Sequence, residues 1–485
     1  MLKISLPYIV ESLTYIFNLS ISQNKFPTQL KQAKVIPLPK AKNLSDINNY
    51  RPISLLSVLS KLLERHVHTH LTSYMETRDL FHPFQSGFRS KHSCVTTLSC
   101  LSDRWLSAIN SAQLSGVVFL DLAKAFDTID HQILLSKLKI YLGDSCHLDF
   151  FQSYLQARTQ YVSVNGLLSS VGLISHGVPQ GSVLGPLLFC VYINDLPLHV
   201  TDTSVECHML ADDTTINKSS PHMQSIQTSL QNTLTDISHW CALNRMNLNP
   251  TKTKSMVLTT RQKHQLRPLT LSLSINNSNI EQVHQHRVLG VIIDDSLQWK
   301  QHVEHLCKLL SRNLYLLSRL QSILPTEAKK VFYSAHIKSH LDYASVVWDG
   351  CSGALFKEIN SRHRRAVRLV SPLQGVSTDS KMADLGLLPL HMHLLFNKAV
   401  FMFKVLNDYA PSYLTDLFHS APSPYSYFKY NLIYPRPRLD IYKTSISFSG
   451  AQLWNTLPTT LKIQTSLSSF KTALHRHFLS TDYKR

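Results

Sequence analysis

Residues 116–131 read Gly-Val-Val-Phe-Leu-Asp-Leu-Ala-Lys-Ala-Phe-Asp-Thr-Ile-Asp-His, and this stretch decides the fold class. The apolar run at its start predicts a fully buried β-strand that ends in a carboxylate, Asp121. Asp127 is predicted to cap the following helix, with Asp130 three residues later in a favourable place near the helix N-terminus. The pattern therefore predicts an acidic group at the end of a buried strand.

A second acidic site lies at Asp212-Asp213, in a predicted tight turn between two strands within 205–216. Two carboxylates 4 Å apart repel by about 4 kcal/mol at an effective dielectric constant near 20. Divalent cations would offset that repulsion, and carboxylate oxygens suit Mg²⁺. Two such ions, about 3.5–4 Å apart, can activate a 3′-hydroxyl and stabilise a leaving pyrophosphate. The spacing alone also allows an ordinary exposed turn and a helix cap.

The remaining pattern is a mixture of strands and helices followed by helices alone. Asn165-Gly166 predicts a hairpin within 160–174, and a Gly/Pro loop at 177–185 leads into an apolar helix. Strands are expected near 254–259 and 288–293. Apolar periodicity predicts helices at 5–22, 57–78, 226–241, 301–324, 326–341, 356–370 and 467–479, with a Pro/Ser/Tyr-rich loop at 420–438.

Composition narrows the class of protein. The 485 residues are 44% hydrophobic, which excludes a mainly disordered chain. Only 16% are charged, yet Lys and Arg exceed Asp and Glu by 18, which favours a polyanionic partner such as nucleic acid. The eight cysteines form no CxxC pair, and no apolar run is long enough to cross a bilayer. We expect an intracellular protein, in the nucleus or cytoplasm, that is neither secreted nor bound to a membrane.

Seven blocks in the same order and at similar separations resemble reverse transcriptases of non-LTR retrotransposons (LINE elements), and the region beyond them, with Trp299 and Trp454, is similar to the jockey-like branch. The two acidic sites lie in the blocks 119–131 and 210–214, and Gly177-Val178-Pro179-Gln180-Gly181 opens the block between them. The other four are Asn49 to Leu55, Gln85 to Arg89, Leu248 to Lys254, and Leu289-Gly290-Val291. The resemblance covers roughly residues 25–295.

The resemblance implies an α+β fold of the right-hand polymerase type: fingers, a palm with an antiparallel sheet, and a helical thumb. The expected division is an N-terminal helical segment at 1–24, fingers and palm at 25–295, and a thumb-like region at 296–372. A mostly helical C-terminal extension follows at 373–485, with a loop near 420–438.

The resemblance also implies site residues. Asp121, Asp212 and Asp213 would be catalytic and, with the main chain at Leu122, would hold two Mg²⁺ ions, for which Mn²⁺ is a possible substitute. Lys252 would protonate the departing pyrophosphate, with Lys254 as its rival. The neighbouring pair Asp294-Asp295 is expected to form a polar turn instead.

Further residues would contact nucleotide and nucleic acid. Phe126 falls at the steric-gate position, where a ring under the sugar collides with a 2′-hydroxyl. The other nucleotide-binding candidates are Lys40, Arg51, Gln180 and Gly181, and Leu289, Gly290 and Val291 would form a primer grip. A basic helix is expected to contact the duplex phosphates through Arg362, Arg364, Arg365 and Arg368.

The implied function is an RNA-directed DNA polymerase that copies element RNA, using an RNA template, a DNA primer and dNTPs, as in target-primed retrotransposition. Two alternatives remain open: a catalytically silent remnant that only binds nucleic acid, and an RNA-copying RNA polymerase, against which Phe126 argues. We recognise no endonuclease domain in the sequence, so that function is expected from elsewhere. Leu210 departs from the pattern, because an aromatic residue is common there.

Overall fold

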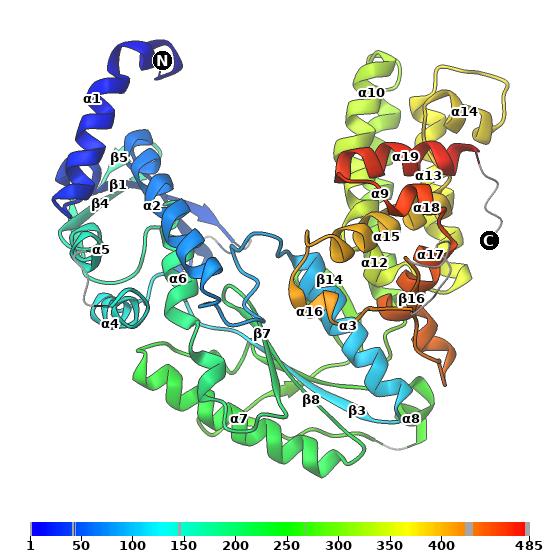
Figure 1. Cartoon of the computed structure of the whole chain (residues 1–485), viewed down its shortest axis with the longest axis horizontal. Helices are drawn as coiled ribbons and strands as arrows, with labels where there is room; N and C mark the ends of the chain where they lie inside the picture. Colours follow the sequence, from blue (N-terminus) through cyan, green and yellow to red (C-terminus); the bar gives the residue numbers. More distant parts are fainter. Residues whose placement is uncertain are drawn as a thin grey trace.

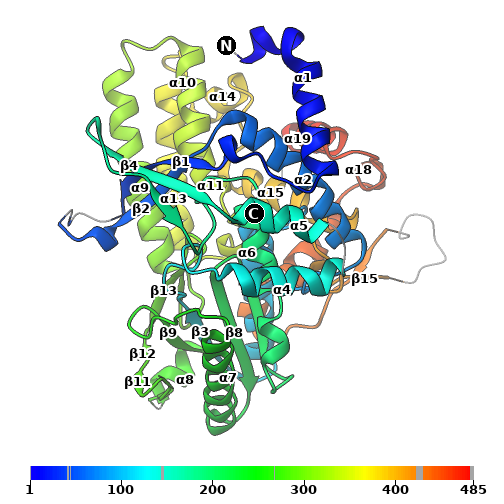
Figure 2. The ribbon, with the colours of Figure 1, turned by 90° about the vertical axis from the view of Figure 1, so that its left-hand side faces the viewer.

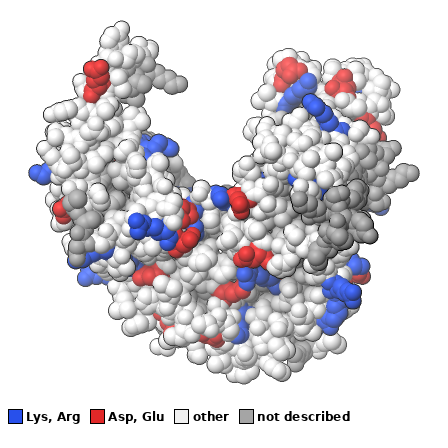
Figure 3. Space-filling model, viewed as in Figure 1, with Lys and Arg blue, Asp and Glu red and all other residues white. Residues whose placement is uncertain are grey.

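The computed structural model of the chain describes residues 2–40, 43, 45–143, 147–266, 268–421 and 430–480. Two lobes rise from a common base and leave a hollow between them (Figures 1 and 3). The fingers-like elements form one lobe, and the helices after residue 300 form the other. The blocks quoted above lie mainly in the base and in the first lobe.

The base is a five-stranded sheet in the order β12-β9-β3-β8-β7, with β3 (Leu114–Leu120) at its centre. Its neighbours β8 (Asp213–Ser220) and β9 (Lys254–Leu258) are antiparallel to it. The outer strands are β7 (Glu206–Leu210) and β12 (Glu281–Gln282). Every residue of β3 is buried, as the sequence predicts.

Two helices cover the two faces of this sheet because successive side chains of a strand point to opposite sides. Val117 and Phe119 join the core that contains α3 (Cys94–Asn110), whereas Val118 and Leu120 join the core that contains α7 (Met223–Leu243). Figure 1 shows α7 running along the base, and Figure 2 shows it at the bottom of the molecule. A Cβ at Gly116 would lie 2.2 Å from Ile226 of α7, so glycine permits the close approach of this helix.

The first lobe contains a second sheet, in the order β2-β1-β4-β5, with β6 also paired to β4. Its strands are β1 (Gln32–Pro39), β2 (Tyr50–Leu55), β4 (Arg158–Val164), β5 (Leu167–Leu168) and β6 (Gly172–Ile174). The predicted turn at Asn165-Gly166 joins β4 to β5, with positive φ at both residues. The helices are α1 (Leu2–Ser22), α2 (Val58–Thr77), α4 (His131–Leu142), α5 (His147–Leu155) and α6 (Gly185–Ile193).

The predicted cap of α4 is wrong: Asp130, not Asp127, begins this helix. One carboxylate oxygen of Asp130 accepts hydrogen bonds from the backbone N–H groups of Gln132 and Ile133, at 2.9 and 3.0 Å. The preceding residues cannot start the helix because Gly177 donates its N–H to the carbonyl of Ile129. The Asp127 carboxylate is thereby left for another partner, described below.

The second lobe is helical. The predicted helix at 326–341 is α10 (Thr326–Tyr333), a π-helical turn (Ser334–Lys338) and α11 (Ser339–Asp342). The others are α9 (Lys300–Leu320), α12 (Ser345–Trp348), α13 (Gly353–Val370), α14 (Thr378–Asp384), α15 (Leu390–Leu406), α16 (Ser412–Thr415), α17 (Ala451–Thr456), α18 (Thr459–Lys462) and α19 (Leu467–Ser480).

Short elements complete the palm and the second lobe. They are α8 (Arg261–Leu266) and the hairpins β10 (Ser274–Ile275) with β11 (Ser278–Asn279), β13 (Gln285–Val288) with β14 (Val291–Asp294), and β15 (His419–Ser420) with β16 (Leu432–Ile433). Part of the predicted loop at 420–438, residues 422–429, lies outside the described residues. Across the part of the chain that is described, no helix is long and apolar enough to cross a membrane.

One apolar core runs from the palm through the second lobe to the last helix. It includes Val117 and Phe119 of β3, Leu310 of α9, Phe403 of α15 and Phe478 of α19. The predicted boundaries at 295 and 372 thus fall within a continuous core, and the division of the chain stays a prediction.

Candidate active site

The three predicted carboxylates come together at one end of the palm sheet. Asp121 directly follows β3, whose last residue pairs with Thr214 of β8, and Asp213 is the first residue of β8. Asp212 lies in the turn between β7 and β8, where Ala211 has a positive φ of 58°. Both residues of the pair are exposed at the surface, which leaves their carboxylates accessible to a ligand.

Electrostatics at this turn disfavours charge on all three groups at once. The surrounding protein displaces water and raises the pKa of Asp213 to about 6, and the charges of Asp212 and Asp121 act in the same direction. The pKa of Asp212 is also raised, by loss of solvation and then by Asp121, while Arg51 opposes the shift. Such mutual repulsion is what a bound cation would relieve.

The donor set suits a hard divalent ion. Within the described residues, no group of three or more His, Cys, Asp or Glu side chains forms a ready-made metal cage. Mg²⁺ does not need one, since it is usually bound by one or two carboxylates, water and substrate phosphates. Exposed carboxylates with raised pKa values therefore fit a metal that arrives with a phosphate substrate.

The segment at 247–253 lies against Asp121 and positions the candidate lysine. Asn249 donates its N–H to the Asp121 carbonyl at 2.9 Å, and Thr253 Oγ1 accepts from the Asp121 N–H at 3.2 Å. Lys252 lines a cavity of about 330 Å³ together with Asp121 and Asp213. Its rival Lys254 is occupied, because its ammonium contacts Glu281 at 2.7 Å.

The predicted primer grip lines the same cavity. Leu289 and Gly290 form the tip of the β13–β14 hairpin, with φ of 45° and 86°, and Val291 begins β14. Tyr343 donates its hydroxyl hydrogen to the Leu289 carbonyl. A Cβ at Gly290 would lie 3.1 Å from the Tyr343 ring, so this close contact favours glycine.

The predicted nucleotide-binding residues lie on the fingers side. The Phe126 ring stacks on Phe189 with centroids 4.5 Å apart, and this contact fixes its orientation. Gln180 donates from Nε2 to the Asp127 carboxylate at 2.9 Å. This carboxylate can accept the bond because Asp130, not Asp127, caps α4. Gly181 has φ of 120°, and a Cβ there would lie 2.6 Å from the Ser54 carbonyl oxygen.

Of the two predicted phosphate-binding residues, Arg51 has the clearer connection to the carboxylates. It lies on β2, and its charge acts on Asp212. Lys40 follows β1 and is exposed. Its role stays a prediction.

A family model described as "Reverse transcriptase (RNA-dependent DNA polymerase)" matches residues 38–293, more than half of the chain. The chain belongs to this family. The right-hand α+β fold predicted above is thereby confirmed, and so is the likeness to jockey-type elements, through the relatives described next.

Three curated relatives come from Drosophila melanogaster. The chain is 31% identical over 368 residues to the probable RNA-directed DNA polymerase from transposon BS, covering 74% of this chain and 40% of the relative. It is 28% identical to the RNA-directed DNA polymerase from mobile element jockey (78% and 42% covered). It is 27% identical to the probable RNA-directed DNA polymerase from transposon X-element (74% and 40%). The chain thus spans about 40% of the length of these relatives.

The turn that carries the candidate catalytic pair Asp212-Asp213, called the catalytic turn below, rests on residues for which the sequence analysis predicted no role at the site. We call residues 85–87 the support segment. Gln85 is fully buried, and its Oε1 accepts from the N–H groups of Gly87 at 2.8 Å and Ala211 at 3.4 Å. Ser86 donates its N–H to the Met209 carbonyl at 2.7 Å. A Cβ at Gly87 would lie 2.4 Å from the Ala211 nitrogen, so no larger residue fits there.

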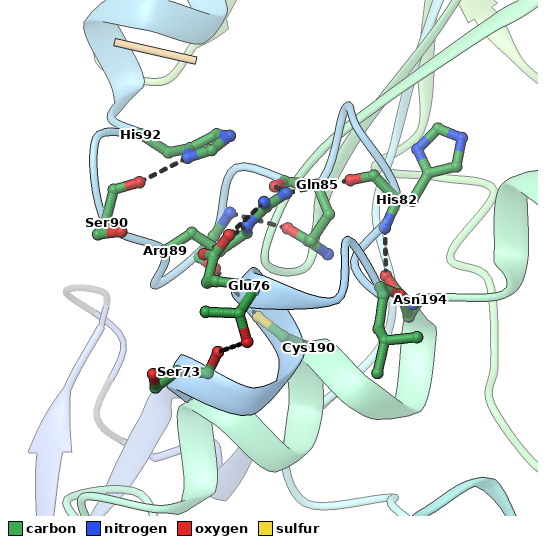
Figure 4. A network of polar contacts seen from close by, with 12 residues as sticks. Ser73, Glu76, His82, Gln85, Arg89, Ser90, His92, Cys190 and Asn194 are labelled. Carbon is green, nitrogen blue, oxygen red and sulfur yellow. Dashed lines mark hydrogen bonds and ion pairs between the residues drawn. The ribbon is translucent and has the colours of Figure 1, made fainter. Parts of the chain in front are cut away.

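The support segment is held to the fingers by the network drawn in Figure 4. Arg89 pairs with Glu76 of α2 at 2.6 Å and donates to the carbonyl of Gln85 at 3.0 Å. Cys190 of α6 donates to the carbonyl of Gly87 at 3.2 Å. The block Gln85 to Arg89 could be found in the sequence, but its contact with the catalytic turn depends on tertiary structure.

The predicted basic helix is α13, and its arginines are partly engaged. Arg364 forms an ion pair with Asp379 at 2.6 Å, Arg362 donates to Ser311 and Glu358, and Arg368 donates to Thr378. Arg365 is exposed. Their contact with nucleic acid stays a prediction.

Helix α9 carries a second basic stripe that the sequence reading missed. Its members are His305, Lys308, Arg312 and Arg319, three or four residues apart or at multiples of that spacing. Burial lowers the pKa of His305, and the charge of Arg287, which lines the cavity, acts in the same direction. The charge of Arg312 likewise acts on His340. The sequence signal for this stripe is a helical repeat of basic residues. It is weaker than the Arg cluster of α13.

Proposed function

We propose that this chain is an RNA-directed DNA polymerase that adds dNTPs to a DNA primer on an RNA template, as in target-primed retrotransposition. The observation that carries the proposal is the site itself. Asp121, Asp213, Lys252 and the tip of the β13–β14 hairpin line one cavity, at the end of the palm sheet, in a reverse transcriptase fold.

Different residues of the chain would bind the metal ions and donate the proton. Asp121, Asp212 and Asp213, with the main chain at Leu122, would hold two Mg²⁺ ions, which Mn²⁺ could replace. When bound, the ions supply activation of the primer 3′-hydroxyl and neutralisation of the phosphate charge. Lys252 is placed to donate its proton to the departing pyrophosphate, because its ammonium is not taken up by Glu281 as that of Lys254 is.

Phe126 would select the sugar. Its ring is held by Phe189 and has an edge contact with Phe88, with centroids 6.4 Å apart, so it cannot easily turn away from an incoming nucleotide. A 2′-hydroxyl is the feature that distinguishes RNA from DNA precursors. Phe126→Ala should therefore admit ribonucleotides, and unchanged sugar selectivity would remove this role.

The remaining groups would bind phosphates, primer and base. Arg51 and Lys40 are suited to the triphosphate, Gln180 and Gly181 to the nucleotide, and Leu289, Gly290 and Val291 to the primer terminus. Arg365 of α13 and the stripe on α9 would contact the duplex phosphates.

The test is primer extension by purified protein on a poly(A) RNA template with an annealed DNA primer, Mg²⁺ and dTTP. The active-site variant is Asp212→Asn. The matched control is Asp295→Asn, from the other Asp-Asp pair. There Asp295 pairs with His284 at 2.7 Å, and Asp294 accepts backbone N–H bonds, including that of Trp299 at 2.8 Å, in the polar turn expected.

Extension by the wild type and by Asp295→Asn, with loss in Asp212→Asn, supports the proposal. If the folded wild type binds RNA in a salt-dependent way but extends no primer, the proposal fails. The catalytically silent remnant is then favoured.

A further inference from the structure

Helix α16, far along the chain, reaches the support segment through Tyr413. This side chain is only 5% exposed, and its hydroxyl lies 3.0 Å from Ser86 Oγ, across 327 positions of sequence. The same hydroxyl lies 3.4 Å from Thr96 Oγ1 of α3. The Tyr413 ring also packs against Phe84, with centroids 5.7 Å apart. The C-terminal extension therefore contacts the residues directly beneath the active site.

Ser86 has partners on two sides. Its backbone N–H donates to the Met209 carbonyl at 2.7 Å, and in the same ladder Met209 donates its N–H to the Phe84 carbonyl at 2.9 Å. Its side chain is 3% exposed and pairs with Tyr413. Met209 lies three residues before Asp212, so a shift of Ser86 moves the strand that carries the catalytic turn.

The fingers and the C-terminal extension hold this segment from different directions. Arg89 and Cys190 hold it to α2 and α6, as Figure 4 shows, and Tyr413 holds it to α16. Burial raises the pKa of Tyr413, so its hydroxyl stays protonated at neutral pH. Removal of one member of a buried hydroxyl pair leaves the other unsatisfied.

We propose that Tyr413 is a positioning residue for the catalytic turn, and that it acts through Ser86. The C-terminal extension thereby becomes part of the support of the active site instead of a separate module. The effect of Tyr413 on the structure of the turn does not depend on the proposed function. Its effect on catalysis rests on the polymerase function proposed above. Small displacements of catalytic groups are costly, because 1 Å can reduce a rate by about 100-fold.

The test compares Tyr413→Phe with a matched control, Tyr442→Phe. Tyr442 lies in the same extension, is also 5% exposed, and has its hydroxyl 3.2 Å from Ser447 Oγ. The two variants thus lose the same group at similar burial. Hydrogen–deuterium exchange of the peptide at 205–216 is followed in metal-free protein, where activity plays no part.

Tyr413→Phe should accelerate exchange in this peptide by about threefold or more, because local opening becomes easier, and Tyr442→Phe should leave it unchanged. Ser86→Ala should reproduce the effect, and the double variant Ser86→Ala/Tyr413→Phe should add little, since the two hydroxyls act as a unit. Equal exchange in the wild type and in both single variants, Ser86→Ala and Tyr413→Phe, would overturn the proposal.

Kinetics separates positioning from general damage. In primer extension, kcat of Tyr413→Phe should fall about 3- to 30-fold with an unchanged KM for dTTP and an unchanged Kd for RNA, because only the alignment of the carboxylates changes. An increase in KM alone would contradict positioning. If the wild type shows no extension, the polymerase proposal fails while the exchange experiment still decides the role of Tyr413.

Discussion

Asp213 in the palm and Asp342 in the helical lobe are the same residue type in opposite electrostatic settings. Asp213 faces Asp212 and Asp121, and loss of solvation together with these charges raises its pKa to about 6. Burial also acts to raise the pKa of Asp342. Hydrogen bonds and charge from His393 and Lys338 outweigh it and hold that pKa well below its usual range.

The two carboxylates differ in the partners that the chain supplies. Asp342 is satisfied within the chain, by Lys338 at 2.6 Å, His393, and Asn397 at 3.0 Å. Its neighbour Asp349 pairs with Lys398 at 2.8 Å, with both side chains buried. The palm carboxylates instead repel one another, and a bound cation would relieve that repulsion. Asp342 and Asp349 are therefore paired within the helical lobe, whereas the palm carboxylates remain available to a ligand.

Substitution of a palm carboxylate should change activity more strongly than stability. Asp212→Asn should lower primer extension by about 1000-fold or more, since metal ions supply several kcal/mol of charge stabilisation and each 1.36 kcal/mol is a factor of ten. Its melting temperature without metal should stay equal or rise, because one repelling charge is gone. Calorimetry in EDTA measures this, and a clear fall in melting temperature would show that the palm carboxylates stabilise the fold.

The reverse pattern is expected at Asp342. Asp342→Asn removes the charge that His393 and Lys338 share, and it should lower the free energy of unfolding by about 2 kcal/mol. This loss of stability is smaller than the usual range for a buried pair because the Asp342 side chain is 34% exposed. Primer extension per folded molecule should not change. Urea denaturation gives the stability, and an unchanged midpoint would contradict the comparison.

The palm was predictable from the sequence for local reasons. The short apolar run before Asp121, with its two valines, favours a buried strand, and Asn165-Gly166 favours a turn by its backbone preferences. The start of α4 was not predictable in the same way. Both Asp127 and Asp130 are good caps, and the choice depends on the loop at Gly177, 47 residues after Asp130.

The contacts that support the site could not be predicted from the local sequence. Gln85 and Ser86 read as a small polar stretch, and their contacts with Met209 and Tyr413 cross more than a hundred residues. The pairing of Lys254 with Glu281 likewise favours Lys252 only once β12 lies beside β9. Residue types identify candidates, but tertiary contacts decide which of them remain free to act.

A smaller effect concerns protonation within the helical lobe. His363 is fully buried against the Tyr333 hydroxyl at 3.0 Å, and burial lowers its pKa to about 3, with the charges of His393 and Arg364 acting in the same direction. Between pH 6.5 and 3 the folded chain then binds one proton fewer than the unfolded chain at this site. The free energy of unfolding falls as the pH falls, by about 1.4 kcal/mol per pH unit.

His363→Gln should remove this contribution, so that the variant loses less stability than the wild type between pH 6 and pH 4. Asp342 does not interfere, because both proteins contain it and its contribution to the pH dependence cancels in the comparison. Urea midpoints at pH 4, 5 and 6 provide the measurement. Parallel pH profiles for the two proteins would mean that His363 is protonated in the folded state.

The weakest effect is expected when a paired and an unpaired arginine of the helical lobe are compared. Arg364 of α13 is neutralised by Asp379, whereas in the described part of the chain Arg312 of α9 has no carboxylate within ion-pair distance. Arg312→Gln should therefore weaken RNA–DNA duplex binding a few-fold and reduce the slope of log K against log salt by about 0.9, the value for one phosphate contact. Arg364→Gln should leave the slope unchanged, because its charge is already used within the chain.

Fluorescence anisotropy between 50 and 300 mM salt gives both slopes. Equal losses in the two variants would show that the duplex breaks the Arg364–Asp379 pair, and a loss in Arg364→Gln alone would move the duplex contact from α9 to α13.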